Sequence, residues 1–181
     1  PCLEESDALM AVGTSLLQGA SDMPCGSVRR QTYDVLTLAD FFKGNPVGSP
    51  GQALIRKSDL VRAGGFDVAI WGADDLDLWM RLSQVGEIRR YRRPCLLYRQ
   101  HSSNASMDFR RMGVNTLKVI SKHIESPYIR NRRRHQIHAY RFLFRYTGRK
   151  LLWEAARCWR DGRREEGMKA LKEVSRIFKT A

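Results

Sequence analysis

The chain has 181 residues, of which 43% are apolar and 9% aromatic, so it can bury a core and is not disordered throughout. It contains no apolar run near the roughly 20 residues that a membrane-spanning helix needs. The net charge is +13, and the whole excess lies in residues 108–181, which carry 20 Lys and Arg against 7 Asp and Glu. We therefore expect a mixed α/β region over residues 1–107 and a basic α-helical extension over residues 108–181.

The first elements are short. Residues 3–20 mix small and apolar side chains without a clear period, which is compatible with either a helix or a strand. Residues 44–51 are dense in Gly, Pro, Asn and Ser and are predicted to form a loop. Residues 53–55 then read Ala-Leu-Ile, which predicts a short buried strand.

A short helix is predicted next. Ser58 is placed to cap a helix over residues 59–62, and Gly64 and Gly65 supply its stop. Phe66 follows the two glycines and is expected to anchor the core.

The clearest helix in the chain runs from about residue 74 to residue 82, and Gly86 ends it. Three carboxylates occupy its first turn, where unpaired backbone N–H groups and the helix dipole favour negative charge: Asp74, Asp75 and Asp77. Residues 88–91 and 95–98 then predict two strands separated by a turn at Pro94, and residues 101–106 a polar loop.

Beyond residue 108 the apolar residues recur at helical spacing. Four stripes are separated by Pro127, Gly148 and Gly162, which predicts a series of helices. The stripes are Val114, Leu117, Ile120 and Ile124; Ile137, Tyr140 and Phe144; Leu152, Ala155, Ala156 and Trp159; and Met168, Leu171, Val174, Ile177 and Phe178.

Several of these features occur together in a characteristic order. Gly64-Gly65-Phe66-Asp67 precedes the acidic helix start Asp74-Asp75-Leu76-Asp77-Leu78-Trp79-Met80-Arg81-Leu82, and Tyr98-Arg99-Gln100-His101 comes later. This set resembles the C-terminal half of the catalytic domain of inverting glycosyltransferases with the GT-A fold, the family 2-like enzymes. The resemblance covers residues 40–106 and implies a partial GT-A, Rossmann-like domain. It also implies that the nucleotide-binding half with its Asp-x-Asp motif precedes residue 1, so we expect this chain to be a fragment that is inactive alone.

The resemblance assigns a role to the acidic pair. Inverting transfer of a sugar requires a base that takes the proton from the acceptor hydroxyl, and by its alignment with the family's second acidic residue Asp75 is the candidate. Asp74 stands where the family usually has Glu and is a candidate acceptor-binding residue, as is Trp71, which could stack on a sugar or cover the core. At a helix N-terminus we expect the Asp75 carboxylate to stay ionised. Plain helix capping is the alternative for both aspartates.

The remaining candidates concern the donor. By the resemblance, Arg99 meets the donor diphosphate and His101 a divalent cation, Mn or Mg, and imidazole suits Mn better; a solvated loop with a structural histidine is the alternative. Asp77 is not assigned to a metal, because within the first helical turn its carboxylate and that of Asp75 point in different directions. An ion pair with Arg81, four residues on, is expected instead.

The implied partners are a nucleotide-sugar donor and a saccharide or lipid-linked acceptor. The basic and aromatic residues over 128–150 suit an anionic membrane surface, with a solvated face over a helical bundle as the alternative. A nucleic-acid-binding module is also considered, although no signature of one is present and the charge avoids the α/β part. Four cysteines without a CxxC pair indicate free thiols in a reducing compartment. We therefore expect a cytoplasmic protein, peripheral at the inner face of the membrane.

Overall fold

The computed structural model describes residue 3 and residues 7–17, 33–99 and 104–179. These fall into two compact units. Unit 1 comprises residues 1–41, 45–69 and 74–104, and unit 2 comprises residues 42–44, 70–73 and 105–181.

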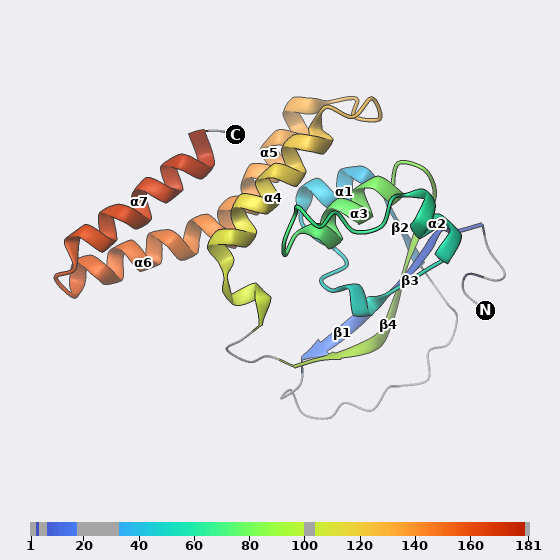
Figure 1. The fold of residues 1–181 in the computed structure, drawn as a ribbon, viewed down its shortest axis with the longest axis horizontal. Coiled ribbons are helices and arrows are strands. Elements are labelled where there is room, and N and C mark those ends of the chain that lie inside the picture. The colour runs from blue at the N-terminus through green and yellow to red at the C-terminus, as the bar shows by residue number, and fades with distance from the viewer. Residues whose placement is uncertain (1–2, 4–6, 18–32, 100–103, 180–181) are drawn as a thin grey trace. The chain divides into compact units, whose positions relative to one another are not determined.

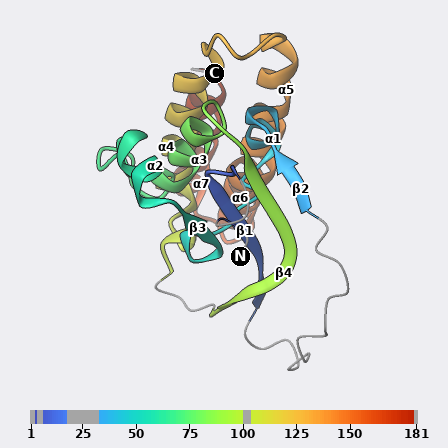
Figure 2. The same ribbon diagram turned by 90° about the vertical axis from the view of Figure 1, so that its right-hand side faces the viewer.

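Unit 1 is built on a mixed four-stranded sheet, so the protein is α/β, as the sequence predicted. The strands are β1 (Met10–Leu17), β2 (Tyr33–Leu36), β3 (Ala53–Ile55) and β4 (Ile88–Tyr98), in the order β2-β4-β1-β3. β1 and β4 are parallel, whereas β2 pairs with β4 and β3 with β1 in antiparallel fashion. Figure 2 shows β4 as a long curved strand with β1 and β2 on its two sides.

Three helices accompany the sheet, as Figure 1 shows. They are α1 (Leu38–Lys43), whose last residues belong to unit 2, α2 (Lys57–Arg62) and α3 (Asp74–Leu82), with a 3₁₀ turn over Pro50–Gln52. α3 buries its apolar face completely, because Leu78, Trp79 and Met80 have no exposed surface. The acidic helix is confirmed, and so is a strand over residues 53–55, but that strand is not buried as predicted, because Leu54 is 63% exposed.

One strand replaces the two that were predicted around Pro94. β4 continues through this proline because it lies opposite Thr14, where the β1–β4 register shifts and a missing backbone N–H is tolerated. Gly13 makes this irregularity possible, since a Cβ there would overlap the Cys95 side chain and the carbonyl oxygen of Arg93.

Two smaller predictions in unit 1 are also wrong. α2 begins at Lys57 with Arg56 at its N-cap and no side-chain cap bond, so Ser58 lies inside the helix rather than capping it. Phe66 is 41% exposed rather than central to the core, although its ring packs edge-on against Trp79 at 6.3 Å. The sequence of residues 3–20 was compatible with either a helix or a strand, and within this range the structure has the strand β1.

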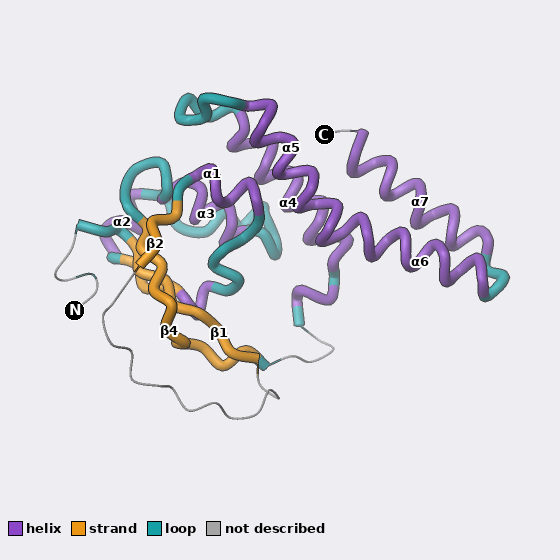
Figure 3. Tube along the Cα trace, turned by 180° about the vertical axis from the view of Figure 1, so that it is seen from behind, coloured by secondary structure: helices purple, strands orange, loops and turns teal. Residues whose placement is uncertain are grey.

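Unit 2 is helical, as predicted for the basic extension (Figure 3). A 3₁₀ turn over Ala105–Met107 precedes α4 (Phe109–Ile124), α5 (Arg132–Leu143), a π-helical segment over Phe144–Gly148, α6 (Arg149–Arg160) and α7 (Arg164–Lys179). The chain stays helical from α5 through the π-helical segment into α6, and α6 and α7 pack as a hairpin whose turn contains Gly162 with a φ of +76°. No helix in the described ranges is both long and apolar enough to cross a bilayer.

The buried faces of these helices differ in part from the predicted apolar stripes. Ile137, Trp159 and Met168 are all more than two-fifths exposed, whereas small residues occupy several helix contacts. A Cβ on Gly113 would overlap the side chain of Thr147, and one on Gly167 would press on the Trp159 ring. The helices approach closely through these glycines, which leaves several large apolar side chains at the surface.

Candidate active site

Hydrogen bonds from Arg81, in the last turn of α3, hold this helix to the turn that contains Gly64 and Gly65. Gly64 and Gly65 have φ values of +83° and +66°, a conformation that favours glycine, so the predicted helix stop is confirmed. The Arg81 guanidinium donates to the carbonyl oxygens of Ala63 and of Gly65, the latter at 2.7 Å. Arg81 also pairs with the fully buried Asp77 at 2.8 Å, which confirms the predicted ion pair and occupies that carboxylate.

Asp75 lies in the first turn of α3 and is half-buried. Its Oδ1 accepts a hydrogen bond from the backbone N–H of Leu76 at 2.6 Å. Its Oδ2 accepts a longer one, 3.4 Å, from the Nδ2 of Asn45. The carboxylate is thus held in place by two neutral donors while part of the side chain reaches solvent.

The environment raises the pKa of Asp75 from its ordinary value of 3.8 to about 6. Removal from water is the largest cause, and the negative charge of Asp74 adds to it. The hydrogen bonds from Leu76 and Asn45 act in the opposite direction and only partly offset the effect. The helix N-terminus was expected to stabilise the Asp75 anion, but burial outweighs the hydrogen-bond donors, so the pKa of Asp75 is raised rather than lowered.

This shift has a direct chemical meaning. With a pKa of about 6, Asp75 is still mainly ionised at neutral pH, and it is a stronger base than an ordinary aspartate. A group with a pKa close to the working pH is the most effective general base. Plain capping has the opposite signature, since stabilisation of the anion by the helix end lowers a pKa.

Asp74 precedes Asp75 and is half-exposed, so its side chain remains open to solvent. Trp71 belongs to unit 2, where its indole is 37% exposed. The Arg111 guanidinium lies over that ring at 4.1 Å from its centre, and the side-chain amide of Asn115 donates to the Trp71 carbonyl oxygen at 2.8 Å. One face of the indole is therefore covered, and sugar stacking on Trp71 would use the other.

Arg99 directly follows β4 and is exposed. The Nδ2 of Asn104 donates to the Arg99 carbonyl oxygen at 3.1 Å and to the Tyr98 hydroxyl at 3.3 Å. His101 lies outside the described residues. The structure therefore places the two aspartates side by side on α3 and Arg99 on a separate element, and it leaves the histidine untested.

The sequence prediction did not include Asn45 among the site residues. Its Oδ1 accepts from the backbone N–H of Val47 at 3.2 Å, a local turn that orients the amide so that Nδ2 faces Asp75. The turn-forming residues at 44–51 are a sequence signal for the turn at Asn45. The partner lies thirty residues further along the chain, and only the fold reveals it.

The residues described do not fit a metal site. Over the described ranges, no group of three or more His, Cys, Asp or Glu side chains is arranged to hold a metal ion. Asp77 is committed to Arg81, and Asp75 is held by amide donors. The divalent cation implied by the resemblance would need ligands other than these.

Comparison with models of known protein families gave no match for the chain, and neither a curated protein nor a solved structure matched it.

Proposed function

We propose that this chain is the acceptor-side part of an inverting glycosyltransferase that uses a nucleotide-sugar donor. The order of the GGFD turn, the acidic helix start and the Tyr-Arg-x-His segment supports this reading, and a partial GT-A domain is the corresponding fold proposal for unit 1. The observation that carries the proposal is the Asp75 carboxylate, which is fixed at the start of α3, reached by solvent and raised in pKa to about 6.

The proposed chemistry follows from that carboxylate. Asp75 accepts the proton of an acceptor hydroxyl as the hydroxyl oxygen forms a bond to the anomeric carbon of the donor sugar. The bond from that carbon to the diphosphate oxygen breaks with inversion, and the nucleoside diphosphate leaves with its electron pair. In this scheme Arg99 meets the negative charge of the departing diphosphate, and Asn45 holds Asp75 in position.

The other predicted residues take supporting roles in the same proposal. Asp74 would contact the acceptor, which is a saccharide or a lipid-linked sugar. His101 would contact a divalent cation together with ligands that the described residues do not supply, so no step is assigned to a metal. A cytoplasmic protein that works at the inner face of the membrane fits a lipid-linked acceptor.

The test is sugar transfer by the complete natural polypeptide, measured with a panel of labelled nucleotide sugars and hydroxyl acceptors. Asp75→Asn should lower turnover by about 10²- to 10⁴-fold, the contribution typical of a general base. Donor binding, measured separately by calorimetry, should be unchanged. Asp34→Asn is the matched control, because Asp34 lies on β2 and pairs with Arg90 at 3.0 Å away from α3.

Two results would count against the proposal. Wild-type polypeptide that transfers no sugar from any donor would reject the transferase reading. Transfer by Asp75→Asn at a rate close to that of Asp34→Asn would reject Asp75 as the base.

A further inference from the structure

A row of cations runs along the continuous helix formed by α5, the π-helical segment and α6. Arg141, Arg145, Arg149, Trp153 and Arg157 recur at every fourth residue, and all five side chains are exposed. Residues four apart are neighbours on successive turns of a helix, so each member of the row lies next to the following one, and sixteen residues span about 24 Å. We call these five residues the basic ridge.

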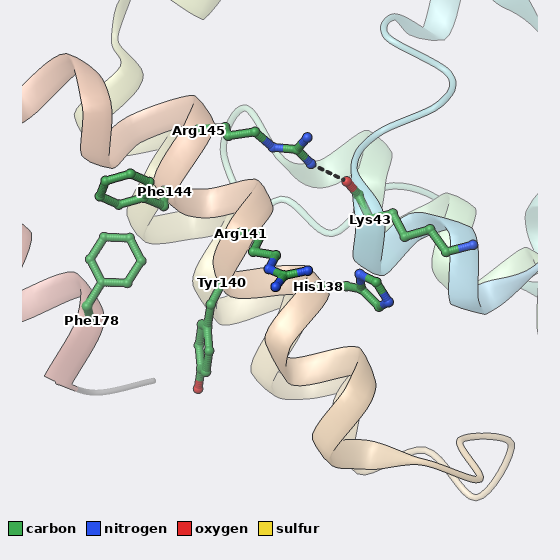
Figure 4. Close-up of a pocket in the computed structure, with 7 residues that line it drawn as sticks. All are labelled: Lys43, His138, Tyr140, Arg141, Phe144, Arg145 and Phe178. Carbon is green, nitrogen blue, oxygen red and sulfur yellow. Dashed lines mark hydrogen bonds between the residues drawn. The ribbon is translucent and has the colours of Figure 1, made fainter.

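Two hollows flank the basic ridge and share Arg145. The first, of about 550 Å³, is lined by Arg141 and Arg145 together with aromatic side chains. Figure 4 shows the Arg145 guanidinium reaching the carbonyl oxygen of Lys43, while the rings of Phe144 and Phe178 face each other at the other end of the hollow. The second, of about 480 Å³, is lined by the ridge from Arg145 to Arg157 and by Phe109, Lys150 and Glu154. The ridge and its hollows thus make one surface that is both basic and aromatic.

The positive charge of this surface is not neutralised within unit 2. Among the ion pairs of the described residues, none includes an arginine of the basic ridge. The one carboxylate that lines the second hollow, Glu154, pairs with Arg110 at 2.6 Å. Like charges at four-residue spacing repel each other, so the arrangement favours a partner with closely spaced negative charges.

Apolar side chains project from the same surface and indicate what that partner is. Trp153, a member of the basic ridge, is 73% exposed, and Phe144, which lines the first hollow, is 42% exposed. At a membrane surface arginine binds lipid phosphates and tryptophan lies at the level of the headgroups. A single-stranded nucleic acid would need several free rings for stacking, but Phe144 already packs edge-on against Phe178, and Trp153 is the one aromatic side chain of the basic ridge.

We propose that the basic ridge docks unit 2 on the surface of a membrane that contains anionic phospholipids. The four arginines contact the phosphates, and Trp153 enters the headgroup region. This docking surface is narrower and lies further along the chain than the stretch over 128–150 expected from composition. It is independent of the proposed transferase activity, because it needs neither donor nor acceptor.

Co-sedimentation of the full 181-residue chain with vesicles tests the proposal. The chain should sediment with vesicles of phosphatidylcholine and phosphatidylglycerol, remain in solution with phosphatidylcholine alone, and be released at high salt. Tryptophan emission should shift to the blue on binding, and Trp153→Phe should remove most of that shift. Equal binding to both vesicles, or none to either, would overturn the proposal.

Charge variants locate the surface. Arg145→Gln/Arg149→Gln should lower the partition constant about 30-fold, since each cation near an anionic surface contributes roughly fivefold. The matched control is Lys169→Gln/Lys172→Gln, which removes the same charge from exposed positions of α7 that line neither hollow. An equal loss in the control would show a general charge effect and reject the basic ridge. Tight binding of a single-stranded oligonucleotide that displaces the vesicles would favour a nucleic acid instead.

Discussion

Replacing Asp75 by Asn should make the protein more stable at neutral pH. The pKa of Asp75 is raised from 3.8 to about 6, so the folded state holds this proton more tightly than the unfolded chain does. Ionisation therefore destabilises the fold. At 1.36 kcal/mol per pKa unit, the cost approaches about 3 kcal/mol once Asp75 is ionised in both states. Asparagine is nearly isosteric and carries no charge, so it removes this cost.

Urea unfolding of wild type and Asp75→Asn between about pH 3 and pH 8 is the assay. The two proteins should have similar free energies of unfolding below the ordinary pKa of 3.8, and the variant should gain stability as the pH rises toward 6 and then stay ahead. Asp34→Asn serves as the control, and its pH dependence should have the opposite sign because the pKa of Asp34 is lowered by hydrogen bonding to Arg90. A variant that is less stable than wild type at pH 8, or a difference that does not depend on pH, would refute the reasoning.

Two substitutions probe the surroundings of Asp75, and two others test ion pairs. Asp74→Asn removes the neighbouring negative charge and should lower the pKa of Asp75, whereas Asn45→Ala removes a hydrogen bond to the anion and should raise that pKa. Carbon-13 NMR titration of the Asp75 carboxyl measures both changes. Shifts of the same sign in the two variants would contradict the assignment of causes. Arg81→Met should cost about 3–5 kcal/mol in urea unfolding, because it takes the guanidinium away from a fully buried carboxylate. Arg132→Met, which breaks a pair with Glu125 in which both side chains are exposed, should cost less than about 1 kcal/mol, and equal losses in the two variants would contradict this account.

The parts of the fold that the sequence predicted correctly depend on neighbouring residues. The start and end of α3, the two glycines that stop α2 and the pair of Asp77 with Arg81 all follow from spacings of a few residues. The strand over 53–55 was also found, because a dense group of turn formers precedes it. Such signals are local, so a single chain displays them without an alignment.

The errors arise where distant segments meet. Pro94 continues inside β4 because an irregularity in β1, eighty residues earlier in the chain, lies opposite it. The partnership of Asn45 with Asp75 depends on the approach of a loop to a helix start. Trp153 and Arg157 lie beyond the stretch over 128–150 that was expected to meet a membrane, since helix periodicity indicates which residues share a face but not which face is covered.

Asp75 and Asp77 lie on the same turn of α3, and their surroundings set them apart. Asp77 is fully buried, but the guanidinium of Arg81 compensates its charge, so this carboxylate serves the structure. Asp75 is less buried, its hydrogen-bond donors are an amide and a backbone N–H, and the negative charge of Asp74 adds to the rise of its pKa. A carboxylate that is stabilised as an anion loses stability on conversion to Asn, whereas Asp75 should gain it. A raised pKa of this kind is the property that the proposed general base requires.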